Sequence, residues 1–245
     1  MQYKIPLEKR LFDIAVASLL LIALFPLFLL VALAIRLESK GKVFYFQSRV
    51  GMNYQIFPFF KFRSMYTDAD KRVAELKDQS QYGNMGSSKT KQASFYENIE
   101  SIRVSDEGIV DESVFLKESE KEVENSFFKV KNDPRITKVG QFIRKTSIDE
   151  LPQLINVLRG EMSLVGNRPL PLYEAEKITE DRFIERFMAP AGITGYWQVT
   201  DRGKDDVSGE GRKLKDVIYA RKSNFLFDLW ILFQTPIAAI QRENV

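Results

Sequence analysis

The strongest hydrophobic pattern in the chain is an apolar run from Ile14 to Ile35, in which Ser18 and Pro26 are the only exceptions. At a helical rise of about 1.5 Å per residue, the run reaches roughly 33 Å, enough to cross a hydrocarbon core of about 30 Å. A cleaved signal peptide fits poorly, because the run is too long and no small-residue cleavage site follows it. The pattern therefore predicts a membrane helix.

Positive charge flanks this run on both sides. The flanking basic residues are Lys4, Lys9 and Arg10 before the run and Arg36, Lys40 and Lys42 after it. The excess of Lys and Arg that marks cytoplasmic ends therefore selects neither end. Pro26 is expected to kink the helix, since proline removes one backbone hydrogen bond and clashes with the preceding turn. Two topologies stay open: a straight transmembrane anchor, which the residues alone favour, and a re-entrant helix with both ends cytoplasmic.

Two segments after the run are rich in aromatic and β-branched side chains, VFYFQSRVG (43–51) and QIFPFFKFRSM (55–65). They predict two short strands in a small hairpin. The composition then changes at 67–131 to Ser, Gln, Asn, Gly and alternating Glu and Lys, which indicates an insertion. Weak helical patterns at 73–76 and 115–123 flank a middle that is expected to be a loop or partly disordered.

Helical spacing returns beyond the insertion. The pattern predicts short helices at 137–145 and 149–158, and Gly160 is placed to end the second. The remaining segments with helical patterns are 183–187, 214–223 and the strongly apolar 223–240. The last of these predicts a core helix.

The composition limits the chemistry that is available. The chain has no histidine and no cysteine. This excludes Ser-His and Cys-His nucleophile pairs, disulfides and zinc sites built on either residue. Any chemistry must rest on carboxylates, Lys, Arg and hydroxyls, with a hard metal ion bound through oxygen if a metal takes part.

Charge is unevenly distributed along the chain. Residues 67–131 carry 14 acidic and 10 basic side chains, which leaves 26 basic and 19 acidic residues elsewhere, a net charge of +7. A basic surface beside a membrane run attracts anionic headgroups and phosphorylated substrates. Nucleic acid is the rival partner, but no segment interleaves basic and aromatic residues as its recognition motifs do. We therefore expect no nucleic-acid partner.

Charged residues gather in one otherwise apolar segment, which contains Asp149 and Glu150. A structural interpretation is strong, because Ser147 and Glu150 have the spacing of a capping box. Alternatively, Asp149 is itself the N-cap and Pro152 occupies the first turn. A functional interpretation is that a helix N-terminus and nearby arginines form an anion site, with one carboxylate as nucleophile and the other as a magnesium ligand. The residues alone leave both interpretations open.

Six segments together resemble a known family. They are KRLFD (9–13), VFYFQSRVG (43–51), KFRSM (61–65), DPRITKVGQFIRKTSIDELPQLINVLRGEMSLVGNRP (133–169), GITGYWQV (192–199) and DVIYARKSNFLFDLWIL (216–232). In this order they are similar to the bacterial sugar transferases, the monotopic polyprenyl-phosphate phosphoglycosyl transferases. The resemblance covers nearly all of the chain outside the insertion.

The resemblance implies an α+β fold that is mainly helical. It places a re-entrant membrane helix, kinked at Pro26, at residues 1–40. A catalytic domain at 41–245 follows, with a small β-hairpin, amphipathic interfacial helices and the insertion at 67–131. The expected location is the bacterial inner membrane, with this domain on the cytoplasmic face. The family forms the kink with a Ser-Pro pair, but Phe25 stands where the serine is expected, so that hydroxyl is missing.

The activity implied by the resemblance is transfer of a sugar 1-phosphate from a UDP-sugar to polyprenyl (undecaprenyl) phosphate, with release of UMP. The product lipid begins exopolysaccharide, O-antigen or glycoconjugate synthesis. Asp149 is implied as the nucleophile that forms a covalent phosphosugar intermediate, and Glu150 as the ligand of a Mg²⁺ cofactor. The implied substrate-binding residues are Arg144, Arg168, Lys61, Arg63, Gln198 and Arg202.

One departure from the family concerns the turn before Arg168. The family usually has GPRP where this chain has Gly166-Asn167-Arg168-Pro169. Asn167 is therefore expected to loosen the turn that aims Arg168.

A second function class stays open: a membrane-anchored scaffold of a glycan assembly complex that keeps the family shape without activity. The intact acidic pair, Arg144 and KFRSM argue against it. A second copy of this chain and downstream glycosyltransferases are the candidate protein partners. No residue identifies the sugar.

Overall fold

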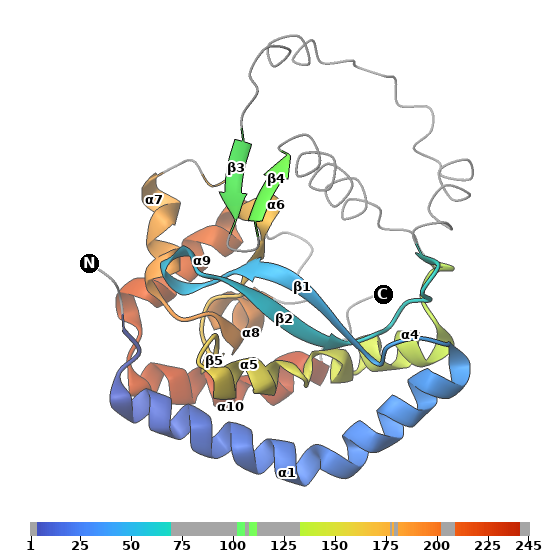
Figure 1. The fold of residues 1–245 in the computed structure, drawn as a ribbon. Coiled ribbons are helices and arrows are strands. Elements are labelled where there is room, and N and C mark those ends of the chain that lie inside the picture. Colours follow the sequence, from blue (N-terminus) through green and yellow to red (C-terminus); the bar gives the residue numbers. More distant parts are fainter. Residues whose placement is uncertain are drawn as a thin grey trace. The chain divides into compact units, whose positions relative to one another are not determined.

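The computed structural model describes residues 4–69, 102–105, 108–111, 133–176, 178, 181–201 and 209–240. The chain forms two compact units, one of residues 1–67 with 136–245 and one of residues 68–135. The first unit is mainly helical with small sheets, as the sequence predicts, and it carries the apolar N-terminal helix (Figure 1).

The second unit contains an antiparallel hairpin of β3 (Ile102–Ser105) and β4 (Gly108–Asp111). The composition of this region predicted a loop here, so the hairpin is a correction: its alternating apolar residues are too few to stand out from the polar context. The helical patterns at 73–76 and 115–123 lie outside the described residues. Near the end of the unit, the guanidinium of buried Arg135 donates to the carboxylate of Asp133 at 2.6 Å.

In the first unit, the apolar run lies within α1 (Leu7–Glu38), which contains Pro26 and bends along its length in Figure 1. By length and composition, α1 is the one helix in the described parts of the chain that could cross a membrane. Its N-terminal half packs on the main core through Ala17, and its C-terminal half packs through Val31 and Ile35 on a second cluster with Phe62. Both halves of the helix therefore rest on the same unit.

The predicted hairpin is confirmed. β1 (Phe44–Val50) and β2 (Ile56–Phe62) pair antiparallel from Phe44 opposite Phe62 to Val50 opposite Ile56. The 3₁₀ turn η1 (Met52–Tyr54) connects them, with Asn53 in the left-handed region at φ 54°. The short β6 (Leu170–Pro171) adds to the other edge of β1, so β1 is the central strand.

The predicted helix at 137–145 is confirmed as α4 (Lys138–Lys145), which is capped by the Thr137 side chain accepting from the Gly140 N–H at 2.8 Å. The continuous helix predicted at 149–158 is wrong. The chain instead forms the 3₁₀ turn η2 (Ile148–Glu150), and α5 (Gln153–Arg159) begins after Pro152. The reason is that Pro152 has no N–H to bond the carbonyl four residues back. Gly160 ends α5 with a left-handed φ of 84°, as predicted.

The rest of the first unit builds the core. β5 (Ser163–Val165) pairs in parallel with β7 (Gly192–Thr194). The remaining elements are α6 (Leu172–Glu176), α7 (Asp181–Ile184), η3 (Glu185–Met188), α8 (Tyr196–Asp201), α9 (Gly209–Lys222) and α10 (Phe225–Ile240). They confirm the helices predicted at 183–187, 214–223 and 223–240. In α10, Ile231 is fully buried whereas Leu226 and Phe233 are 76% exposed, so this helix is a core helix on one face only.

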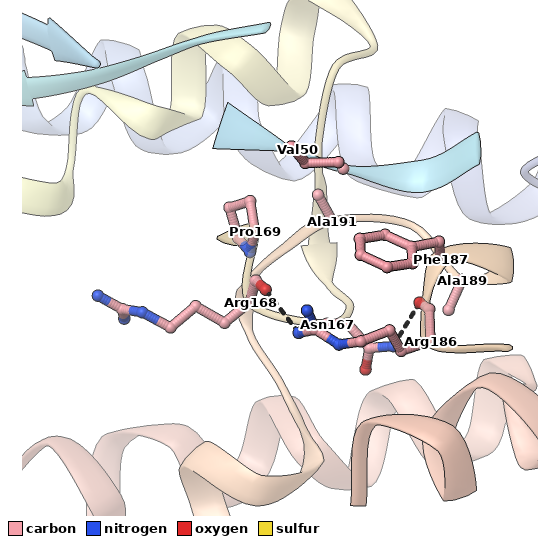
Figure 2. Close-up of a pocket in the computed structure, with 9 residues that line it drawn as sticks. Val50, Asn167, Arg168, Pro169, Arg186, Phe187, Ala189 and Ala191 are labelled. Carbon is pink, nitrogen blue, oxygen red and sulfur yellow. Dashed lines mark hydrogen bonds between the residues drawn. The ribbon is translucent and has the colours of Figure 1, made fainter. Parts of the chain in front are cut away.

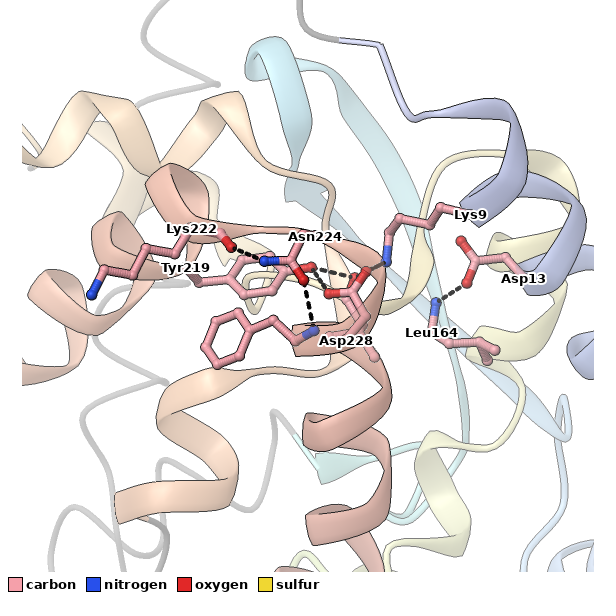
Figure 3. A network of polar contacts seen from close by, with 9 residues as sticks. Lys9, Asp13, Leu164, Tyr219, Lys222, Asn224 and Asp228 are labelled. Carbon is pink, nitrogen blue, oxygen red and sulfur yellow. Dashed lines mark hydrogen bonds and ion pairs between the residues drawn. The ribbon is translucent and has the colours of Figure 1, made fainter.

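A buried polar network fixes the start of α1 to this core (Figure 3). The Lys9 ammonium donates to the Asp228 carboxylate at 2.5 Å and to the Val165 carbonyl at 3.0 Å. The Tyr219 hydroxyl lies within hydrogen-bond distance of the same two residues, 2.7 Å from the Asp228 carboxylate and 3.1 Å from the Val165 carbonyl. One carboxylate of α1, that of Asp13, accepts from the Leu164 N–H at 3.1 Å. Residues from α1, β5, α9 and α10 thus share one set of bonds.

Candidate functional site

The acidic pair lies beside cations that come from distant parts of the sequence. The Lys61 ammonium, on β2, lies 2.7 Å from Glu150 Oε1 and 3.7 Å from Asp149 Oδ2. Arg168 Nη2 lies 3.3 Å from the same Glu150 oxygen. The structure therefore brings together four of the predicted site residues, with Lys61 and Arg168 both paired to Glu150.

Burial governs the electrostatics of Asp149, whose residue surface is only 7% exposed. Burial raises the pKa of its carboxyl above the usual value, because the charged form loses solvation. Lys61 is the main group that lowers this pKa, while the neighbouring charge of Glu150 raises it; Arg144 and Arg168 lower it further. Asp149 is thus a desolvated carboxyl group beside several cations, an environment suited to a nucleophile.

The backbone before the pair explains why the two carboxylates converge. Ser147 adopts a left-handed conformation at φ 57°, which turns the chain sharply out of α4 and into η2. The Ser147 side chain does not cap this turn, and the N-cap position of α5 is Pro152. Both structural interpretations of the pair, the capping box and an Asp149 N-cap, are therefore wrong.

Asn156, which the sequence did not single out, holds β2 against α5. Its fully buried side chain accepts from the Phe60 N–H at 3.1 Å and donates to the Pro58 carbonyl at 2.6 Å. The amide therefore bonds the free edge of β2 much as another strand would, one residue from Lys61. No local pattern could reveal this, because the partners are about 100 positions apart.

Arg144 comes to the same region from α4. Its Nε donates to the Ser64 hydroxyl at 2.8 Å, which fixes the guanidinium just beyond the end of β2. Its charge acts on Asp149, as described above. Arg144 therefore belongs with the cations around the pair.

The turn that carries Arg168 is held by three hydrogen bonds that Asn167 donates, contrary to the expectation from the sequence. The buried Asn167 amide donates to the carbonyls of Arg186 and Asp216 at 2.8 and 3.0 Å, and its backbone N–H donates to the Pro190 carbonyl at 2.9 Å. The asparagine thus tightens the turn through donors that a proline lacks. The prediction that it loosens the turn is wrong.

The buried ion pair between Arg186 and Asp216 supports the backbone of this turn. Arg186 donates to the Asp216 carboxylate at 2.6 Å and to the Arg168 carbonyl at 3.0 Å. Figure 2 shows the Arg168 side chain extending away from these contacts, so its backbone is held while its guanidinium projects. Burial raises the pKa of Asp216 to about 6, although the Arg186 guanidinium lowers it in part.

Three other predicted residues lie elsewhere or outside the described residues. The Arg63 guanidinium donates to the Ser39 and Lys40 carbonyls at 2.6 and 2.9 Å, just after α1, so it fixes the end of that helix. Gln198 is buried in α8 and donates to the Ile193 carbonyl at 3.3 Å. Arg202 lies outside the described part of the chain.

A magnesium ion can be tested against the donor set. Among the described residues, no group of three or more acidic, His or Cys side chains is arranged so that it could hold a metal ion. Asp149 and Glu150 still fit Mg²⁺, since this ion is commonly bound through one or two carboxylates with substrate phosphates and water as its other ligands. A site of this kind would be completed only with a phosphorylated substrate present.

Comparisons with known proteins agree on one family. A family model described as bacterial sugar transferase matches residues 4–242. The undecaprenyl-phosphate galactose phosphotransferase of Salmonella typhimurium is 35% identical over 96% of this chain and 41% of its own length. The exopolysaccharide production protein ExoY of Sinorhizobium fredii is 36% identical over 97% and 88%. The UDP-glucose:undecaprenyl-phosphate glucose-1-phosphate transferase of Escherichia coli is 32% identical over 94% and 39%. The chain thus spans less than half the length of two of these relatives.

Replacing Arg186 tests whether the ion pair supports the Arg168 turn. Arg186→Met leaves the Asp216 carboxylate buried without its partner, and we expect a loss of about 3–5 kcal/mol in the free energy of unfolding near pH 8. The loss should shrink near pH 5, because the raised pKa lets the folded state hold a proton on Asp216 there. Urea unfolding in detergent at both pH values measures it.

The matched control is Arg221→Met. Arg221 and Glu185 pair between the same two elements, α9 and η3, but at the surface. We expect little change from this variant at either pH. Equal losses in the two variants would contradict the role given to the buried pair.

Proposed function

Because the chain belongs to the bacterial sugar transferase family, we propose that it transfers a sugar 1-phosphate from a UDP-sugar to polyprenyl phosphate and releases UMP. The proposed reaction is an early step of exopolysaccharide, O-antigen or glycoconjugate synthesis. The observation that carries the proposal is the buried Asp149 beside Glu150, with Lys61, Arg168 and Arg144 around them. The names of the relatives supply the lipid acceptor and sugars of the galactose or glucose type.

In the proposed first step, an oxygen of the Asp149 carboxylate attacks the phosphorus that bears the sugar. A bond forms between Asp149 and phosphorus, the diphosphate bridge breaks, and UMP leaves with the electron pair. In the second step, an oxygen of the lipid phosphate attacks the same phosphorus and frees the Asp149 carboxylate. The product is a polyprenyl diphosphate sugar.

This mechanism needs no general base, which suits a chain without histidine. Both attacking groups are already anions, so no proton has to be removed. The difficulty is repulsion among anions, and fixed cations reduce it. The contacts support this role for Lys61 and Arg168: Lys61 pairs with both carboxylates and Arg168 with Glu150, and each could shift its hydrogen bonds to a phosphate that enters.

We propose Glu150 as the protein ligand of Mg²⁺. When bound, the ion would neutralise charge on the donor diphosphate. In support, Glu150 Oε1 accepts from both Lys61 and Arg168, the cations that we propose contact the substrate phosphates.

We also propose that α1 is re-entrant and that the catalytic domain faces the cytoplasm at the bacterial inner membrane. The support is that both ends of the helix bond to the same unit: Lys9 to Asp228 near its start, and Glu38 to the N–H groups of Lys138 and Val139 at its end. A straight crossing would carry one of these ends to the opposite membrane face. Exposed apolar side chains on α1 and α10, such as Leu30 and Phe233, would face lipid.

The alternative is a scaffold without activity. The buried Asp149 argues against it, because a desolvated carboxylate beside a second one costs stability that a scaffold has no reason to retain. Downstream glycosyltransferases and a second copy of the chain remain proposed partners of either form.

Replacing the nucleophile tests the activity directly. Asp149→Asn should lower UMP release by about a thousandfold or more, because the amide cannot attack phosphorus. The wild-type chain incubated with UDP-glucose or UDP-galactose alone should gain the mass of a hexose phosphate on the peptide that bears Asp149, and the variant should not. Intact-peptide mass spectrometry and a UMP assay measure both, with EDTA added in parallel to test the metal.

Glu185→Gln is the control, since it removes an exposed carboxylate paired only at the surface. It should keep both activity and mass gain. An Asp149→Asn variant that still turns over would end the assignment of the nucleophile, and absence of UMP release from a panel of UDP-sugars would favour the scaffold.

The raised pKa of Asp149 predicts a pH dependence. Activity should fall on the acid side as Asp149 takes up its proton, at a higher pH than for an exposed aspartate. Lys61→Met removes the main group that lowers this pKa, so the acid limb should move to still higher pH. The pH profile of UMP release measures the limb, with the exposed Lys40→Met as control. A limb that stays in place in the Lys61 variant contradicts this role of Lys61.

Single cysteines test the topology, because the chain has none of its own. Gly41 is a poor site, since its φ is 124° and a Cβ there would meet the Arg63 guanidinium. Lys4→Cys and Lys42→Cys are better, because both positions are exposed. In sealed inner-membrane vesicles of known orientation, a membrane-impermeant maleimide should label both or neither. Labelling of only one contradicts re-entry.

A further inference from the structure

Arg49 is a cation of the site for which neither the sequence nor the comparisons give a role. It lies on β1, the central strand of its sheet, where its backbone pairs with Phe57 on one side and Pro171 on the other. Strands on both sides hold this position rigidly. The side chain is therefore aimed by the sheet rather than by a loop.

The register puts Arg49 on the same face of the sheet as Lys61. In a strand pair, directly opposed residues share a face and alternate residues return to it. Both charges also contact one aromatic ring: the Arg49 guanidinium carbon and the Lys61 ammonium each lie 5.4 Å from the centre of Phe59. Phe59 itself is buried, so it fixes both cations without neutralising either.

The hydrogen bonding of Arg49 is incomplete. One terminal nitrogen donates to Gln47 Oε1 at 2.9 Å. Its Nε is buried and lacks a hydrogen-bond partner among the described residues. A buried N–H donor of a charged group that lacks a hydrogen bond lowers the stability of the fold. We therefore expect an acceptor to bind at the Arg49 Nε.

The charges near Arg49 point to the kind of acceptor. Burial and then the like charge of Arg168 lower the pKa of the Arg49 guanidinium, while Glu174, Tyr173 and Glu150 act in the opposite direction. Two guanidinium groups close enough to repel each other favour an anion between them. A phosphate can accept from both, and arginine forks match its oxygens.

We propose that Arg49, together with Arg168, binds a phosphate group of a substrate at the face of the sheet that carries Lys61. The proposal rests on the proposed function for the identity of its ligands, a nucleoside diphosphate donor and a lipid phosphate acceptor. Both present the same chemistry to the guanidinium, so experiment must separate them.

The test uses the full chain in detergent and Arg49→Met, which keeps an unbranched side chain as far as the Nε position but removes the charge and the donors of the guanidinium. UDP is the probe for the donor, since it binds without being turned over. Its dissociation constant, from equilibrium dialysis, should rise about tenfold or more if Arg49 holds the donor diphosphate. If Arg49 holds the acceptor instead, UDP binding should stay the same and the KM for undecaprenyl phosphate should rise by a similar factor.

Arg49→Lys keeps the positive charge but removes the planar pair of guanidinium donors, so it separates these two contributions to binding. It should recover only part of the lost affinity, because an ammonium cannot donate two parallel bonds. Glu174→Gln is the matched control: if Arg49 serves mainly as a structural partner of Glu174, the two variants should lower the unfolding temperature alike and leave UDP affinity and the acceptor KM unchanged. That result overturns the proposal.

Failure of the proposed function gives a different pattern. The wild-type chain would then release no UMP from any donor, whereas the effect of Arg49→Met on UDP binding could still be measured. Unchanged UDP binding and unchanged acceptor KM in a folded Arg49→Met variant that releases UMP at its normal rate would reject the role of Arg49 alone.

Discussion

The N-terminal helix α1 organises the site by bonding to the outer ends of the two helices that flank the acidic pair. At its start, Arg10 donates to the carbonyls of Val157 and Leu158 at the end of α5. At its end, the Glu38 carboxylate accepts from the first N–H groups of α4. Each charge has the sign that the dipole of its partner helix favours. Because η2 connects α4 to α5, a single helix fixes the frame in which Asp149 and Glu150 sit.

Within that frame, the basic side chains of the site outnumber its two carboxylates. Lys61 and Arg168 already share one carboxylate oxygen, and Arg144 is fixed nearby through Ser64. Such an arrangement is stable with two carboxylates but can accept further negative charge, which is what a diphosphate donor and a lipid phosphate would bring. The buried Asp149 carboxyl and the surrounding cations are therefore parts of one electrostatic balance, in which a change to the cations alters the pKa of Asp149.

Much of the local structure could be predicted from the sequence, because strand alternation, the Thr137 cap and the left-handed Gly160 depend on near neighbours. The family resemblance located the acidic pair, and its geometry agrees with a site, whereas the chemical roles of its members remain predictions. The contacts that place the site could not be predicted. Asn156 meets β2 and Lys9 meets Asp228 across about 100 and 200 positions, with no repeat or spacing to signal either.

The buried Asn167 has a consequence for engineering this chain. Stabilisation by consensus, in which unusual residues are replaced by those their relatives prefer, normally gains free energy. Here proline, the residue that the family resemblance leads us to expect at position 167, would delete a backbone donor to Pro190 and two amide bonds to Arg186 and Asp216. Asn167 supplies the donors for three carbonyl groups in distant parts of the chain, so exchanging this residue alone would leave those acceptors without their partner.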